Sequence, residues 1–184
     1  MQDNPVLNAI RERRSIRKYE PTAVLTEVVD QLLYAAAMSP TAMNKQEWEF
    51  IVVTDRKTIN DLSVRVKKQM GLIGYAQKFA ERFTSKEDLI FYSAPLLVIV
   101  TAPKDNEWAH IDCGILAQTM FLAAHSLGLG SCYIGFARTL NKDADALKML
   151  GVPPEGEIVA PLIFGYAAEK KGLQKREPKV VKRI

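Results

Sequence analysis

The feature that most constrains this chain is a helix-length segment, residues 109–127, that is apolar on almost every side. Its apolar residues do not fall on one stripe, as they include Ile111, Ile115, Leu116, Met120, Leu122 and Ala123. Gly128 follows directly and predicts the end of the helix. A helix that is apolar all round must be covered on every side, so we expect it in the centre of a core or at an interface.

Shorter helices and apolar strands alternate along the rest of the chain. Asn4-Pro5 predicts the start of the first helix, with an Asn cap and proline at the first helical position. Strands are predicted at residues 48–54, 95–101, 131–136 and 158–166, the first of them buried on both faces, and Asn141 is predicted to cap a short helix that ends near residue 150. The alternation predicts a sheet with helices on both faces, whereas residues 71–91 have no assignable pattern.

The bulk composition favours one soluble domain. The chain has 184 residues, 48% of them apolar, which is enough for a single sizeable core. No apolar run approaches the ~18 residues of a membrane span, and the N-terminus lacks a secretory signal. Two cysteines, Cys113 and Cys132, do not make a disulfide framework. We therefore expect a cytoplasmic protein with no membrane partner.

The net charge of +4 is concentrated in two places. Residues 169–184 carry seven basic and two acidic side chains, so this tail is +5 and the rest of the chain is −1. Residues 11–18 hold five cations against Glu12. Two basic patches on a near-neutral body favour the anionic groups of small molecules over nucleic acid, and the tail after Tyr166 lacks the aromatic residues that a nucleic-acid binder interleaves. A solvated tail end is the alternative for most of its lysines.

The first basic patch contains a regular pattern. If residues 13–17 are extended, Arg13, Ser15 and Arg17 point to the same side. Two guanidinium groups and a hydroxyl on one side suit a phosphate. The alternative is a helix end whose cations interact favourably with the helix dipole.

Two other segments have the residue types of a binding site. Residues 39–48 form a loop with neutral donors and acceptors that could recognise the edge of a heterocycle, although taken alone the segment is better explained by ordinary loop chemistry. Residues 128–135 combine small residues and glycines, so their backbone N–H groups could approach a flat ligand. The alternative for this segment is a helix stop followed by a tight entry into a strand.

Taken in order, these segments resemble the nitroreductase family of FMN enzymes. The family pattern R-x-S-x-[RK] is matched by RRSIR at residues 13–17, and its polar loop by SPTAMNKQEW at residues 39–48. GLGSCYIG at residues 128–135 and PLIFGYAAE at residues 161–169 follow the remaining motifs. The resemblance covers essentially the whole chain, and one departure is Glu47, where the family usually has proline.

The resemblance implies a three-layer α/β/α fold of the α+β class, with a central mixed, largely antiparallel sheet and helices on both faces. It implies one domain over residues 1–184 and a homodimer with FMN at the subunit interface. The basic tail from about residue 169 would pack on the partner subunit.

The resemblance also implies roles for individual residues. Arg13 and Ser15 would hold the FMN phosphate and ribityl end with Arg14 alongside, and Arg17 would lie near the N1/O2 end of the ring. Lys175 or Arg176 would complete the phosphate pocket. The contacts implied for the ring are the Ile134 and Gly135 backbone near N5 and O4 and, from the other subunit, Pro40, Thr41, Ala42, Asn44 and Gln46. Lys67 and Lys68 are possible further contacts.

The implied activity is hydride transfer from NADH or NADPH, a transient reductant, to a small electron-poor acceptor in a ping-pong order. FMN carries this chemistry, so no catalytic side chain and no metal are expected, and His110 and His125 are interpreted as structural. The alternatives are a flavin-storage protein or a specialised relative, such as a dehalogenase-like, flavin-fragmenting or azoline-oxidising enzyme.

Overall fold

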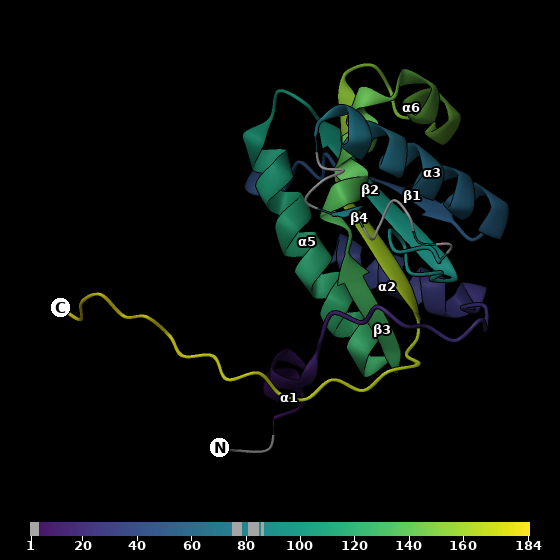
Figure 1. Ribbon diagram of the computed structural model, residues 1–184. Coiled ribbons are helices and arrows are strands. Elements are labelled where there is room, and N and C mark those ends of the chain that lie inside the picture. The colour runs from purple at the N-terminus through teal and green to yellow at the C-terminus, as the bar shows by residue number, and fades with distance from the viewer. Residues whose placement is uncertain (1–3, 75–78, 81–84, 86) are drawn as a thin grey trace.

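A computed structural model describes residues 4–74, 79–80, 85 and 87–184 of the chain, so the unassigned stretch 71–91 lies partly outside the described residues. Its strands form one antiparallel sheet in the order β1-β2-β4-β3 (Figure 1). Their bounds are Glu49–Val53 for β1, Leu96–Pro103 for β2, Leu129–Tyr133 for β3 and Gly156–Tyr166 for β4.

Helices cover both faces of this sheet, which confirms the three-layer α+β prediction. Their bounds are Pro5–Glu12 for α1, Thr26–Ala37 for α2, Ala42–Asn44 for η1, Arg56–Leu72 for α3, Glu107–Ser126 for α5, Gly135–Lys142 for η2 and Ala144–Leu150 for α6. One hydrophobic cluster joins α2 and α5 to the sheet, and a second joins α3, η2 and α6 to its other face (Figure 1). None of the helices in the described residues is long and apolar enough to cross a membrane.

The apolar run in β2 follows from its central place between β1 and β4. Leu96, Val98 and Val100 face the α2/α5 cluster, whereas Leu97 and Ile99 face the α3 cluster. Because successive side chains point to opposite faces and both faces are covered, the five positions from Leu96 to Val100 are all apolar.

Strand β1 corrects the prediction that this segment is buried on both faces. It pairs with β2 alone among the described strands and lies at the edge of the sheet, where Val52 is 39% exposed. All three strand pairings are antiparallel, and the parallel component of the predicted mixed sheet is limited to one isolated bridge between Ser15 and Ser131.

Helix α5 is only half covered within one protomer. Leu116 and Met120 are fully buried against the sheet. On the opposite side Trp108, Ile111 and Ile115 are 60%, 52% and 41% exposed. The apolar residues on one side of α5 therefore form part of the core, whereas those on the opposite side are exposed in this chain.

Two predicted boundaries around residues 131–150 are wrong. The strand ends at Tyr133, and the chain turns into the 3₁₀ helix η2 at Gly135. The N-cap of α6 is Asp143, whose carboxylate accepts a hydrogen bond from the Ala146 N–H at 3.0 Å. Asn141 lies inside η2 instead, and its side chain bonds to β4.

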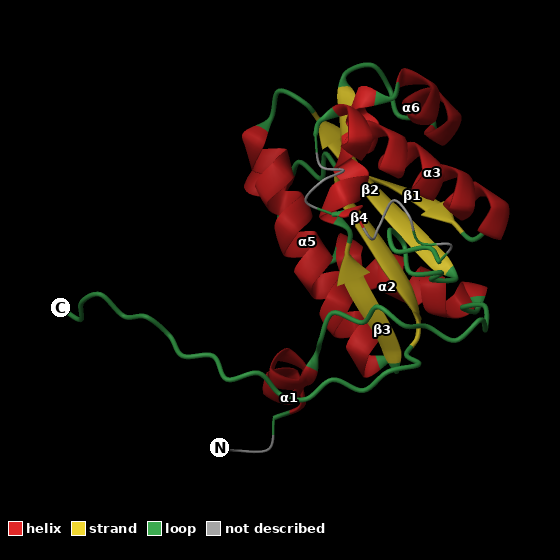
Figure 2. Ribbon diagram, viewed as in Figure 1, coloured by secondary structure: helices red, strands yellow, loops and turns green. Residues whose placement is uncertain are grey.

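The chain ends in an extended tail. Residues 170–184 have no helix or strand and are exposed, and Figure 2 shows this segment running away from the body beyond α1. Each residue from 170 to 184 is therefore largely accessible to solvent.

Candidate functional site

The basic segment at residues 13–20 is held on both edges by backbone hydrogen bonds. The Ile16 N–H donates to the Ser131 carbonyl of β3 at 3.0 Å, and the Ala168 N–H donates to the Lys18 carbonyl at 2.9 Å. Gly130 allows this close approach, because a Cβ at that position would lie 2.8 Å from the Ile16 Cβ. Residues 13–20 are thus fixed between β3 and the chain that leaves β4.

The carboxylate of Glu169 adds a second attachment to the same segment. It accepts a hydrogen bond from the Arg17 N–H at 2.6 Å and pairs with the Lys171 ammonium at 3.3 Å. Lys171 also donates to the Ser15 carbonyl at 2.9 Å. Burial raises the pKa of Glu169, but the Arg17 and Lys171 contacts outweigh it and hold the pKa below its ordinary value.

The buried thiol of Cys132 lies beside this segment. Burial raises the pKa of Cys132, whereas the charge of Arg17, a hydrogen bond with Ser15 and the charges of Lys171 and Arg13 lower it. The Arg13 guanidinium lies beside the ring of Phe121, and that of Arg17 lies beside the ring of Tyr92. Arg14 points elsewhere, and its Nε donates to the Gly172 carbonyl at 3.1 Å.

The surroundings of the Arg13 side chain suit the binding of an anion. Its guanidinium carbon lies 5.8 Å from the centre of the Phe121 ring, and its Nε is buried without a hydrogen-bond partner among the described atoms. Burial lowers the pKa of Arg13, and the positive charges of Arg14 and Arg176 lower it further. Arg13 is half-buried as a whole, and a buried N–H of a guanidinium without a partner costs free energy, so this position fits a phosphate.

The tail residues Lys175 and Arg176 differ in their surroundings. Lys175 forms an ion pair with Glu177 at 2.9 Å, and its side chain is 88% exposed. Arg176 is close enough to Arg13 for its charge to lower the pKa of Arg13. Of these two residues, Arg176 is the one whose charge acts on Arg13.

A cavity of about 650 Å³ joins Arg17 to Ile134 and Gly135, the residues predicted to meet the flavin ring. A second cavity of about 810 Å³ also includes Arg17 and brings Lys67 of α3 to it. Lys68 is exposed and is not among the described lining residues of either cavity.

Tyr92 lines both cavities and was not found from the sequence. The Arg17 guanidinium carbon lies 5.9 Å from the centre of its ring, within the range of a cation–π contact. Tyr92 and Ser93 have φ angles of +55° and +52°, which are unfavourable for residues other than glycine. The Asp88 carboxylate holds this turn by accepting a hydrogen bond from the Ser93 N–H at 3.3 Å.

The polar loop at residues 39–48 is attached to α5. The Ala42 N–H donates to the buried Asp112 carboxylate at 2.9 Å. Within the loop the Gln46 N–H donates to Thr41 Oγ1 at 3.2 Å, and the Gln46 amide donates to Asn44 Oδ1 at 3.1 Å. The sequence offered no sign that Asp112, in the middle of an apolar helix, would hold this loop.

One protomer does not bring this loop to the Arg13–Arg17 segment. Asp112, which holds the loop, and Phe121, which lies beside Arg13, are nine residues apart on α5, about 13 Å along the helix axis. Pro40 at the start of the loop is exposed. The two motifs therefore form separate groups on the surface of one chain.

Both groups contain buried polar atoms without partners. In the described part of the chain these atoms are Arg13 Nε, Ser39 Oγ and Trp48 Nε1. Ser39 and Trp48 are the two ends of the polar loop, and Arg13 begins the basic segment. Buried donors are normally satisfied, so their occurrence at these two segments marks both as incomplete.

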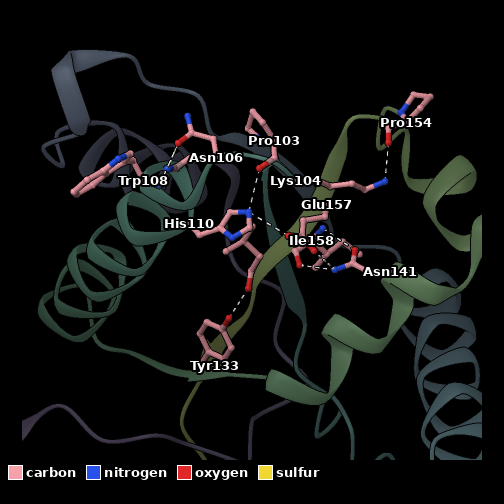
Figure 3. A network of polar contacts seen from close by, with 12 residues as sticks. Pro103, Lys104, Asn106, Trp108, His110, Tyr133, Asn141, Pro154, Glu157 and Ile158 are labelled. Atoms are coloured by element: carbon pink, nitrogen blue, oxygen red, sulfur yellow. Dashed lines mark hydrogen bonds and ion pairs between the residues drawn. The ribbon is translucent and has the colours of Figure 1, made fainter.

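A polar network lies beside the smaller cavity (Figure 3). His110 Nε2 is 3.1 Å from both the Pro103 carbonyl and Glu157 Oε1, and the Asn141 amide donates to Glu157 Oε2 at 3.1 Å. The same amide group also bonds the Ile158 carbonyl at 2.9 Å and accepts from the Ile158 N–H at 2.8 Å. The network fixes the end of η2 to β4.

The chain is similar to proteins of known families and structures. The family model described as Nitroreductase family matches residues 10–166. A putative NADH dehydrogenase/NAD(P)H nitroreductase of Methanothermobacter thermautotrophicus is 34% identical over 173 residues, which are 91% of this chain and 80% of that protein. An FMN reductase (NADPH) of Bacillus subtilis is 29% identical over 185 residues, which are 96% of this chain and 71% of that protein.

The fold matches as well. The crystal structure of a nitroreductase with bound FMN from Bacteroides fragilis superposes with a TM-score of 0.86 and 32% sequence identity, and the match covers 98% of each chain. With the family match spanning most of its length, the chain belongs to the nitroreductase family.

Proposed function

We propose that this protein is an FMN-dependent oxidoreductase that uses NADH or NADPH to reduce small electron-poor acceptors, such as nitroaromatics and quinones. The observation that carries the proposal is Arg13, a half-buried side chain whose buried Nε has no hydrogen-bond partner among the described residues, in a segment fixed between β3 and the chain after β4. The FMN bound to the Bacteroides fragilis relative and the name of the Bacillus subtilis FMN reductase support extending this cofactor to the present chain.

The phosphate end of FMN would lie at the basic segment. Arg13 and Ser15 would bind the phosphate and ribityl end, because the Arg13 Nε is buried without a partner among the described residues and Ser15 lies two residues further along the same extended segment. Arg14 would stay alongside, since it already bonds the tail at Gly172. Arg176 would complete the pocket rather than Lys175, because its charge already acts on Arg13.

The ring end would lie where the cavity meets Arg17. When bound, FMN supplies the chemistry of accepting a hydride equivalent from the nicotinamide and passing it to the acceptor. Arg17 would place a positive charge near N1 and O2, and Tyr92 would keep its guanidinium in position. Ile134 and Gly135 would offer backbone contacts near N5 and O4. Reductant and acceptor would use the same cavity in turn, which is a ping-pong order.

A homodimer would complete the site. The exposed apolar side chains of α5, together with Val6, Leu7 and Ile10 of α1, offer a surface for a second copy of the chain. The polar loop, through Pro40, Thr41, Ala42, Asn44 and Gln46, would then reach the partner's flavin, and the tail from about residue 169 would pack on the partner's body. Residues 1–184 would act as one domain in this assembly.

Visible absorbance tests the proposal directly. The protein purified with FMN should show a flavin spectrum that bleaches when NADH or NADPH is added without oxygen, and that returns when a nitroaromatic or quinone is added. A yellow protein that does not bleach would favour a storage protein or a specialised relative. A colourless protein that fails to take up added FMN would contradict the proposal.

A further inference from the structure

We infer that the 650 Å³ cavity over Gly135 selects acceptors that carry an anionic group, such as a carboxylate, and that Arg138 and Lys142 of η2 bind that group. The inference rests on the proposed function, because the cavity receives an acceptor only if Gly135 lies beside the flavin ring. It adds a substrate class to that function.

The 3₁₀ geometry of η2 places the two cations on the cavity side. Side chains three residues apart eclipse one another in such a helix. Arg138 therefore follows Gly135 on one face, while Ala137 and Leu140 share another face that is buried, at 1% and 0% exposed. Lys142 lies on the third face and also lines the cavity.

The described lining of the cavity offers no acidic partner to Arg138 and Lys142 that is not already engaged. Within the described residues neither Arg138 nor Lys142 forms an ion pair. The acidic side chain among the described lining residues is Glu157, and its carboxylate is already engaged by His110 at 3.1 Å and by the Asn141 amide at 3.1 Å. The described lining of the cavity therefore carries a net positive charge, from Arg17, Arg138 and Lys142 against Glu157.

The helix η2 that carries both cations is attached to β4 by hydrogen bonds. Asn141 bonds both the N–H and the carbonyl of Ile158, so the end of η2 cannot move away from β4 without breaking two backbone contacts (Figure 3). Burial raises the pKa of Tyr133 and the charge of Arg138 opposes this shift, which places Arg138 close to Tyr133 at the cavity wall.

The opposite lining suits a flat, apolar body. Ile73, Ile90, Tyr92 and Phe136 contribute apolar and aromatic surface to the same cavity. A planar aromatic ring could rest there, with its anionic substituent at Arg138 and Lys142. The same chemistry could serve a phosphate of the reductant, so the test has to separate the acceptor from the nicotinamide.

Calorimetry on the FMN-loaded protein gives a readout that does not depend on turnover. Benzoate and benzamide are matched probes that differ in charge, and we expect the wild-type protein to bind benzoate roughly fivefold more tightly, a modest figure because both cations are exposed. The double variant Arg138→Gln/Lys142→Met should lose that preference. Lys148→Met, which removes an exposed cation of α6 outside the described lining, should keep it.

Steady-state kinetics then assign the source of the anion. In the double variant the KM for 4-nitrobenzoate should rise about fivefold, whereas kcat and the KM for 4-nitrobenzamide should stay within about twofold of wild type. Equal losses with both acceptors would overturn the inference. A rise confined to the KM for NADPH would also overturn it, because the cations would then serve the reductant.

Flavin content separates this inference from the proposed function. Failure of the wild-type protein to bind FMN would contradict the proposed function itself. Full FMN occupancy without any preference for benzoate over benzamide would leave that function standing and would overturn only the anionic-acceptor inference.

Discussion

The basic segment at residues 13–20 and the polar loop at residues 39–48 are both cofactor motifs, but the protomer holds them differently. The first is bonded on one edge to β3 and on the other to the chain after β4, with Glu169 and Lys171 as further attachments. The second depends on Asp112 and on contacts within the loop. The first motif is fixed along two edges of its backbone, whereas the second is attached to α5 through one carboxylate.

The backbone angles strengthen this contrast. Met43, Asn44 and Gln46 in the loop have φ angles of +52°, +54° and +53°. Such angles cost free energy in non-glycine residues and persist where surrounding contacts enforce them. The loop therefore keeps a strained backbone, whereas the basic segment is held by ordinary extended pairing.

Removal of Arg13 should have the largest effect on FMN binding. Arg13→Ala deletes the half-buried guanidinium whose buried Nε has no partner among the described residues, so we expect FMN affinity to fall roughly 100-fold. Fluorescence titration of FMN measures this loss. Arg11→Ala is the matched control, because Arg11 is exposed and pairs with its neighbour Glu12. An equal loss in both variants would mean that net charge, and not Arg13, attracts the cofactor.

A methyl group at Gly130 should break the attachment of the basic segment to β3. The new Cβ of Gly130→Ala would lie 2.8 Å from the Ile16 Cβ, so we expect a loss of about 2 kcal/mol in the free energy of unfolding and weaker FMN binding. Urea denaturation measures the first effect. Gly172→Ala, where a Cβ meets nothing within 4 Å, should change neither quantity. Wild-type stability of the Gly130 variant would contradict this attachment.

The loop should respond differently from the segment. Asp112→Ala removes the acceptor of the Ala42 N–H, and we expect FMN affinity to fall about tenfold because the loop loses its attachment to α5. Asp112→Asn keeps an acceptor oxygen and should lose less. The comparison fails if both Asp112 variants bind FMN as tightly as the wild type does.

The pH dependence of stability should show the smallest effect. The folded-state pKa of Glu169 lies below its ordinary value of 4.5, so the carboxylate stabilises the fold above pH 4.5 and loses this effect as the pH falls through the folded-state pKa. Glu169→Gln should lower the free energy of unfolding by about 1 kcal/mol at neutral pH. The difference from wild type should shrink below pH 4.5, and a constant difference at all pH values would contradict this role.

Local patterns could be predicted from the sequence, and long-range contacts could not. The extended shape of residues 13–17 was predicted correctly, since Ser15 forms a bridge to Ser131 and the Ile16 N–H bonds the Ser131 carbonyl. Asp112 and Tyr92 were missed because their partners are far away in sequence. Arg138 was missed because residues 131–136 were predicted as one strand, which concealed the three-residue spacing that begins at Gly135.

The same limit explains other outcomes. The apolar sequence of α5 predicted burial on every side of the helix. It could not show which side packs against the sheet of the same chain and which side is exposed there. The sequence also could not show which of Lys175 and Arg176 lies nearer to Arg13, because this depends on the path of the extended tail past α1. Edge and centre of the sheet were indistinguishable for residues 48–54, since an apolar run is compatible with either place.

Complementation between two defective subunits tests the shared site most directly. Arg13→Ala disables the basic segment, and Thr41→Ala/Asn44→Ala disables the loop, so neither homodimer should hold FMN. A purified heterodimer of the two has one site with both defects and one with neither, and we predict about one FMN per two chains. A heterodimer without FMN, or a loop variant that binds FMN fully by itself, would contradict a site shared between subunits.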